Sequence, residues 1–196
     1  RMQTSKKLFS LFELYGIMTI AFRSIPLLRR EKAAGKMNHA FLERIMLAVT
    51  EVNGCAMCSY YHTRVALEEG FSIEEIRNML GGVHSDVPEE QLAGVLFAQH
   101  YADQRGEPSR ESWNALTAAY GETGAYGVLA VTRMIMMGNA TGIPAGSFIN
   151  RFRGRPDPRS NVAYELMMMA AMLLFMPLAG LTAVIQNLAK APIIRF

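Results

Sequence analysis

The sequence predicts an all-α protein, from the spacing of its apolar residues, its helix start and stop signals, and its lack of strand patterns. Apolar residues recur at intervals of three and four along most of the 196 residues, which is the spacing of one helix face. Glycine, asparagine and proline interrupt these stretches where helices typically end. No segment alternates between apolar and polar residues for long, so we expect a helical bundle.

Two helices are expected in the N-terminal part of the chain. Residues 5–22 carry apolar side chains at helical spacing, and we expect Pro26 to stop this segment. Residues 39–52 form the second helix. Asn53-Gly54 ends it, because glycine readily adopts the left-handed conformation that follows many helices.

Five further helices are expected in the middle of the chain. One begins near Cys55 and runs to Gly70. Ser72 and Glu75 form a capping box that opens a short helix to about Leu80. Helix start signals then predict the remaining helices and one loop: residues 88–104, residues 109–120, residues 124–137, and a loop from Gly138 to Gly146.

The C-terminal part is unusually apolar. Residues 166–189 carry no formal charge, and this length is sufficient to cross a bilayer. Pro177 and Gly180 interrupt the stretch, so we expect a buried helical hairpin or a subunit interface, with membrane contact as the alternative that we do not favour. The resulting organisation is an N-terminal helical extension (1–34), a central domain (35–150), and a basic loop with an apolar helical segment (151–196).

Composition narrows the classes of partner. Hydrophobic residues make up 51% of the chain and charged residues 19%, so we expect a large core and a homo-oligomer. The net charge is only +3, without a basic stripe or a nucleic-acid module, so we expect no nucleic-acid partner. The densest basic patch is expected to be a solvated loop: Arg151, Arg153, Arg155 and Arg159.

The only two cysteines are Cys55 and Cys58. Because they lie three residues apart, a disulfide between them closes almost no loop and stabilises the fold little. Secreted disulfide scaffolds use more cysteines at wider spacing. No convincing signal peptide is present, since Glu13 interrupts the first apolar stretch. We therefore expect reversible chemistry in a reducing compartment, the cytoplasm.

The spacing around the cysteines predicts a catalytic group. At positions i and i+3 of a helix, the sulfurs of Cys55 and Cys58 share a face, and the positive end of the helix favours their thiolates. His62 lies one turn beyond Cys58 and is placed to accept its proton. Glu43 and Glu51 on the preceding helix are both candidates to orient His62. Nucleophile, base and orienting carboxylate together form an activation scheme.

Three other interpretations of the cysteines are possible. They could be structural buried residues. A zinc site that included His62 would need a fourth ligand, usually from a distant second pair, and no such pair exists; the other histidines are His39, His84 and His100. A thioredoxin-like motif would need strands around it. We expect neither a metal nor a cofactor.

Glu43 followed by Cys55-x-x-Cys58-x-x-x-His62 resembles the signature of the alkyl hydroperoxidase D branch of the carboxymuconolactone decarboxylase superfamily. In that branch a glutamate lies twelve residues before the first cysteine, the position that Glu43 occupies. The resemblance is specific over residues 40–70 and looser over residues 35–140. One departure is Met57, because the best-known members carry a histidine there.

The resemblance implies an alkyl hydroperoxidase D-like helical bundle, homo-oligomeric, with an additional apolar C-terminal helical segment in this chain. It implies a peroxidase whose substrate is a hydroperoxide and whose disulfide is restored by a dithiol reductant or a reducing partner protein. Cys58 would react with peroxide, Cys55 would resolve the product, and Glu43 and His62 would relay the proton. We also expect Cys55, nearer the helix start, to meet the reductant more easily.

Two further hypotheses use the same residues. The dithiol could act as a non-catalytic redox sensor or as the switch of an interaction protein. Alternatively, the apolar segment could bring the thiols close to lipid hydroperoxides. Turnover with a small dithiol would separate the enzyme from the sensor.

Overall fold

The computed structural model describes residues 6, 8–34 and 37–196, and leaves out the side chains of residues 32–34. In these residues it contains seven α-helices and no strand, which confirms the all-α prediction. Residues 5 and 7 of the first expected helix lie outside the description. The helices are α1 (Leu11–Ala34), α2 (His39–Asn53), α3 (Ala56–Glu68), α4 (Ile73–Leu80), α5 (Glu89–Asp103), α6 (Arg110–Arg151) and α7 (Val162–Leu188).

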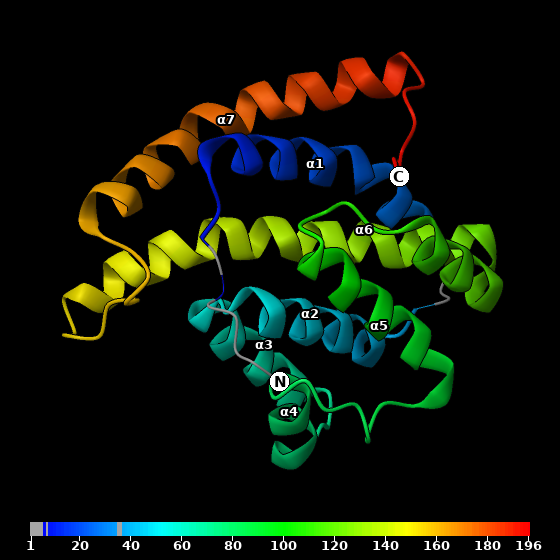
Figure 1. Ribbon diagram of the computed structural model, residues 1–196. Coiled ribbons are helices and arrows are strands. Elements are labelled where there is room, and N and C mark those ends of the chain that lie inside the picture. The colour runs from blue at the N-terminus through cyan, green and yellow to red at the C-terminus, as the bar shows by residue number, and fades with distance from the viewer. Residues whose placement is uncertain (1–5, 7, 35–36) are drawn as a thin grey trace.

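The helices pack in layers around α6 (Figure 1). On one side of α6 lies α1, and α7 covers α1 as the outermost helix. On the other side, α2, α3 and α5 contact α6, while α4 packs against α2 and α3. The N-terminal helix and the C-terminal segment therefore pack on the central domain as parts of one body, and the division at residues 34 and 150 stays a prediction.

The ends of α2 and α4 follow the expected local signals. Gly54, with φ of 67°, ends α2 in the left-handed conformation, and its N–H donates to the carbonyl of Thr50. The Ser72 hydroxyl accepts from the Glu75 N–H at 3.0 Å and begins α4. These ends were predictable because each depends on two or three neighbouring residues.

The expected stop at Pro26 is wrong, because α1 continues to Ala34. A proline inside a helix removes one hydrogen bond and costs about 3 kcal/mol. Pro26 lies on the exposed side of α1, while buried residues such as Ile17 and Met18 pack into the core. Burial of α1 between α6 and α7 offsets the local cost.

The expected loop from Gly138 to Gly146 is also wrong, since these residues lie inside α6. The helix assignment spans 42 residues and is interrupted only at Gly121, whose φ of 68° and ψ of 172° separate the two helices that the sequence predicts. Glycine weakens an isolated helix. Here it lets the α6 backbone approach its neighbours closely, and the functional site below depends on that approach.

The expected C-terminal hairpin is replaced by one helix, α7, that continues through Pro177. Only a narrow stripe of α7 is buried against the body: Glu165, Met168, Ala179 and Ala183. Both α1 and α7 are long and apolar enough to cross a membrane, a property that core helices share. They differ in burial, which is 39% for the most apolar window of α1 and 17% for that of α7.

Two buried arginines fasten the residues that follow α7. The Arg23 guanidinium donates to the carbonyl oxygens of Ala191 at 2.7 Å and Pro192 at 3.1 Å. The Arg133 guanidinium donates to the carbonyl oxygen of Ile193 at 2.8 Å. Charge-assisted bonds of this kind are stronger than neutral ones, so the C-terminal tail is held firmly against the body of the protein.

At its other end, α7 is fastened by the fully buried carboxylate of Glu165. Arg151 donates two hydrogen bonds to it, at 2.6 and 2.8 Å, and the hydroxyls of Ser147 and Ser160 donate as well. The bond from Arg151, followed by those from the serines, lowers the pKa of Glu165 to about 2 against the opposing effect of burial.

We predict that Glu165→Gln lowers the free energy of unfolding at neutral pH by roughly 3–5 kcal/mol, the cost of breaking a buried ion pair. Because the folded-state pKa is lowered, this stability is present above about pH 4.5 and is lost as the pH falls toward 2. Urea unfolding across this range should show a shallower pH dependence for the variant. The exposed Glu107→Gln is the control, and equal effects of the two substitutions would refute the prediction.

Candidate functional site

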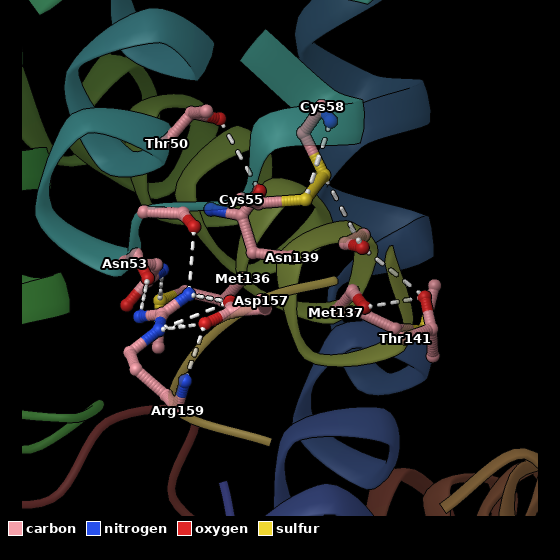
Figure 2. The surroundings of a disulfide bond; sticks show 12 residues. Thr50, Asn53, Cys55, Cys58, Met136, Met137, Asn139, Thr141, Asp157 and Arg159 are labelled. Carbon is pink, nitrogen blue, oxygen red and sulfur yellow. Dashed lines mark hydrogen bonds and ion pairs between the residues drawn. A yellow bond between two sulfur atoms is a disulfide. The ribbon is translucent and has the colours of Figure 1, made fainter. Parts of the chain in front are cut away.

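Cys55 and Cys58 are joined by a disulfide at the start of α3, with their Cα atoms 5.3 Å apart (Figure 2). Cys55 is the N-cap of α3, and its sulfur accepts a hydrogen bond from the Cys58 N–H at 3.2 Å. The expectation that the two sulfurs meet at a helix start is confirmed. Free N–H groups at this helix end favour the thiolate form when the pair is reduced.

Both sulfurs are nearly enclosed by protein. Cys55 is 1% exposed and Cys58 is 8% exposed. The expectation that Cys55 meets a reductant more easily is therefore wrong for the oxidised form. Its position as N-cap places the Cys55 side chain inside the turn between α2 and α3, whereas Cys58 keeps a small opening.

The middle of α6 forms the floor beneath the disulfide. The Cys58 sulfur lies 3.6 Å from the carbonyl oxygen of Gly138 (Figure 2). A Cβ atom on Gly142 would lie 2.8 Å from the Cys58 sulfur and 3.0 Å from the Cys55 sulfur. A Cβ on Gly146, one turn later, would lie 3.0 Å from the Cβ of Met57. The dithiol thus fits only against a bare backbone, a requirement that sequence reasoning missed.

We predict that Gly142→Ala lowers the free energy of unfolding by about 1–3 kcal/mol, because the added methyl group overpacks the disulfide. Gly138→Ala is the matched control in the same helix, since its Cβ would make only an ordinary contact of 3.7 Å with Ile135. That substitution should be neutral or stabilising. Urea unfolding of the oxidised proteins measures both, and equal stability of the two variants would contradict the prediction.

A buried carboxylate–imidazole pair lies on the same two helices as the dithiol turn. Glu43 Oε2 from α2 is 2.8 Å from Nδ1 of His62 in α3, and both side chains are buried. With Nδ1–H donating to Glu43, the other ring nitrogen, Nε2, is the proton acceptor. His62 follows Cys58 by one helical turn.

Of the two glutamates considered for this pair, the structure brings only Glu43 to His62. Glu51 Oε1 instead lies 3.5 Å from the ammonium nitrogen of Lys6, which also donates to the Glu51 carbonyl. The two carboxylates are eight residues apart on α2, a separation that the sequence pattern left undecided. The catalytic role of Glu43 stays a prediction.

The turn before Cys55 is held by a residue from the basic patch between α6 and α7. Arg159 donates to the carbonyl oxygens of Gly54 at 2.9 Å and Asn53 at 3.3 Å, and forms an ion pair with Asp157 (Figure 2). Hydrogen bonds from Arg159 also lower the pKa of Asp157. The expected solvated loop is thus only partly solvated, because Arg151 and Arg159 are bound while Arg153 and Arg155 are exposed.

A cavity of about 350 Å³ opens beside this turn, between the glycines of α6 and the loop at residues 155–159. Met57, the residue between the cysteines that departs from the family pattern, lines it together with Gly142 and Gly146. A small reactant in this cavity would approach the start of α3.

In the described part of the chain, no group of three or more histidine, cysteine, aspartate or glutamate side chains is arranged to hold a metal ion. The arrangement itself supplies a cysteine pair that forms a disulfide and, one turn along α3, an imidazole bonded to a carboxylate. His39, His84 and His100 contribute nothing to it, because they bond elsewhere: His84 to Gln99, His100 to the Ser109 N–H, and His39 to Glu69.

Residues 26–99 match the family model described as the carboxymuconolactone decarboxylase family. The matched segment runs from within α1 into α5 and contains Glu43, both cysteines and His62. No curated protein and no solved structure matches the chain significantly. The match covers 74 of the 196 residues, and the all-helical fold and Cys-x-x-Cys pair of the chain are consistent with the alkyl hydroperoxidase D branch of that family.

Proposed function

We propose that the protein is a thiol-dependent hydroperoxide reductase. The observation that supports this most directly is the pairing of a Cys55–Cys58 disulfide with a buried Glu43–His62 hydrogen bond on the same two helices. A disulfide with a purely structural role does not require a buried imidazole one helical turn from its sulfur. Peroxide reduction uses both, since it needs a thiolate nucleophile and a group that moves protons.

In the first step, His62 takes the proton of the Cys58 thiol and the thiolate attacks the terminal oxygen of the hydroperoxide. The O–O bond breaks, Cys58 becomes a sulfenic acid, and the leaving alkoxide receives the proton from His62 and departs as an alcohol. Glu43 holds the imidazole in the tautomer that serves this transfer and stabilises its charged form.

In the second step, the Cys55 sulfur attacks the Cys58 sulfenic acid, water leaves, and the disulfide seen in the structure forms. A dithiol reductant, either a small molecule or a partner protein, then supplies two electrons and two protons by thiol–disulfide exchange. Cytoplasmic reducing conditions suit this cycle, and we propose that compartment.

The direct test is consumption of hydrogen peroxide and cumene hydroperoxide by the purified protein, with dithiothreitol or dihydrolipoamide as reductant. We expect catalytic turnover of the full chain and none from a variant in which both cysteines are serine. Absence of turnover with every combination, in protein whose thiols are shown to be reduced, would refute the proposal.

A redox switch is the second candidate, and the enclosure of the sulfurs favours it. With Cys55 at 1% and Cys58 at 8% exposure, a bulky reductant reaches the disulfide only if the turn opens. A switch would be oxidised once by stoichiometric peroxide and re-reduced too slowly for turnover. The same assay, followed over several equivalents of peroxide, separates the two functions.

We predict that Glu43→Gln slows peroxide reduction by at least tenfold, because the amide cannot stabilise a charged His62. Glu51→Gln is the matched control on the same helix, since its carboxylate lies beside Lys6 and not beside His62. Initial rates with saturating reductant measure the effect. Loss of activity in Glu51→Gln, with wild-type rates in Glu43→Gln, would show that the wrong carboxylate has been chosen.

A homo-oligomer stays a proposal, and its interface must lie away from α1. Most apolar side chains of α1 are packed between α6 and α7, so this helix offers little surface to a second copy. Exposed apolar side chains on α3 and α4, including Tyr60, Tyr61 and Ile73, are better placed to meet a second copy.

A further inference from the structure

We propose that the outward face of α7 binds the surface of an anionic lipid bilayer, with the helix lying in the plane of the membrane. This inference is independent of the proposed function. The outward face consists of the large apolar side chains that the rest of the chain leaves exposed in the uncharged part of α7: Leu166, Met167, Leu173, Leu174, Met176, Leu178, Leu181, Val184, Ile185 and Leu188.

The outward face is too apolar to be an ordinary protein surface. Its ten large side chains are 46–79% exposed, and no charged residue occurs between residues 166 and 189. This uncharged stretch is about 36 Å long as a helix. Soluble monomers rarely expose contiguous apolar patches above a few hundred Å², and larger patches mark protein or membrane contacts.

Contacts along α7 keep the helix flat against the body. Near its start, Glu165 is bound by Arg151. In its second half, the Thr182 hydroxyl lies 2.7 Å from the Tyr15 hydroxyl of α1, and at the end Asn187 accepts from Arg23 at 3.2 Å. Figure 1 shows α7 running alongside α1 as the outermost helix. A helix fastened at both ends presents one side to a membrane and cannot cross it without breaking these bonds.

The charge of the chain is divided in a way that complements anionic lipid. Residues 123–196 contain seven basic and two acidic residues, whereas residues 1–122 contain 13 basic and 15 acidic residues. Both acids of the C-terminal part, Asp157 and Glu165, are ion-paired with arginines. Exposed basic residues remain on both sides of α7: Arg153 and Arg155 before it, and Lys190 and Arg195 after it.

This arrangement disfavours a second copy as the occupant of the outward face. If two α7 helices paired side by side, each basic end would meet another basic end, whether the helices ran parallel or antiparallel. Like charges at an interface are repulsive. Lipid headgroups with negative charge would satisfy both ends at once, and basic residues near an apolar helix face strengthen its binding to an anionic membrane surface.

The test is flotation of the full chain with vesicles of phosphatidylcholine alone and of an equal mixture of phosphatidylcholine and phosphatidylglycerol. We expect binding to the mixed vesicles, at least tenfold weaker binding to phosphatidylcholine, and weakening by salt, because screening shortens the reach of surface charge. Alkaline carbonate should release the bound protein, since α7 does not span the bilayer.

Two double variants, each with a matched control, assign the binding to α7 and to its flanking charges. Leu173→Glu with Leu181→Glu should abolish flotation, while Val83→Glu with Leu96→Glu, exposed sites in the loop after α4 and on α5, should leave it unchanged. Arg153→Gln with Arg155→Gln should weaken binding roughly tenfold to thirtyfold, as expected for two basic residues near the surface. The matched control is Arg64→Gln with Arg77→Gln on α3 and α4. Circular dichroism verifies the fold of each variant. If Leu173→Glu with Leu181→Glu unfolds, Leu173→Ser with Leu181→Ser takes its place.

Three results would overturn the inference. The first is equal binding by the α7 variants and their controls. The second is a protein that binds neither kind of vesicle and is a dimer in detergent-free buffer. If Leu173→Glu with Leu181→Glu dissociates that dimer, the outward face is a contact between copies. The third is resistance to carbonate, which would show a spanning helix.

Discussion

We expect that replacing Cys58 with serine abolishes peroxide reduction, and that replacing Cys55 with serine leaves one reaction per chain. This result is expected because Cys58 is the sulfur one turn from His62 and retains the larger opening, 8% against 1% exposed. In Cys55→Ser, the Cys58 sulfenic acid has no resolving thiol and persists. In Cys58→Ser, Cys55 is two turns from the base and inside the turn, so it stays an ordinary thiol that oxidises slowly.

Mass spectrometry after stoichiometric hydroperoxide, in the presence of a dimedone-type probe, decides between the two sulfurs. The probe should label Cys58 in Cys55→Ser, and label little of Cys55 in Cys58→Ser. The reverse pattern would exchange the two roles. No label on either variant, with an inert wild type, would leave the redox switch or a structural pair as the explanation of the cysteines.

Replacing His62 with alanine should slow the proposed peroxide step by about 10²–10⁴-fold, the usual cost of losing a general base. The variant also leaves the Glu43 carboxylate buried without its partner, so its fold must be verified by circular dichroism and thermal unfolding. Stopped-flow measurement of Cys58 oxidation, at several pH values, gives the rate of this step alone.

The pH profile separates a base from a structural residue. If His62 accepts the Cys58 proton, the rate in the variant should rise with pH as the thiol ionises without help, and the gap from the wild type should narrow in alkali. Tyr61→Phe is a control at the adjacent position, where the ring stacks edge-on against His62 at 5.1 Å. A pH-independent loss in His62→Ala would assign the residue to the fold instead.

Local sequence patterns were sufficient for the dithiol turn and the ends of the short helices. Gly54 and Ser72 determine their helix ends through bonds to residues a few positions away. The spacing of Cys55, Cys58 and His62 places them on one helix start, which needs no knowledge of the rest of the chain. The choice between Glu43 and Glu51 could not be made from local spacing, because either residue of α2 fits the pattern. Only the position of α3 against α2 brings Glu43 to His62.

The features that the sequence did not predict depend on packing between distant segments. Glycines at 138–146 are typical of a loop in isolation, but here Gly142 lets the α6 backbone approach the sulfurs and Gly146 lets it approach Met57. Pro26 and Pro177 are tolerated because α1 and α7 pack along neighbouring helices. The carbonyl groups of residues 53 and 54 are bound by Arg159, more than 100 residues later, and no local signal reveals such a contact.

The bonds from Arg23 and Arg133 to residues 191–193 also affect the order in which the chain acquires its structure. A nascent polypeptide emerging from the ribosome exposes α1 and α6 well before the carbonyl groups that these guanidiniums require. Until then, two positive charges destined for the interior must remain hydrated, and the groove that α7 will cover must stay partly open. The environment of these two arginines is therefore complete only once residues 191–193 have docked, and the face that α7 would present to a membrane forms at the same stage.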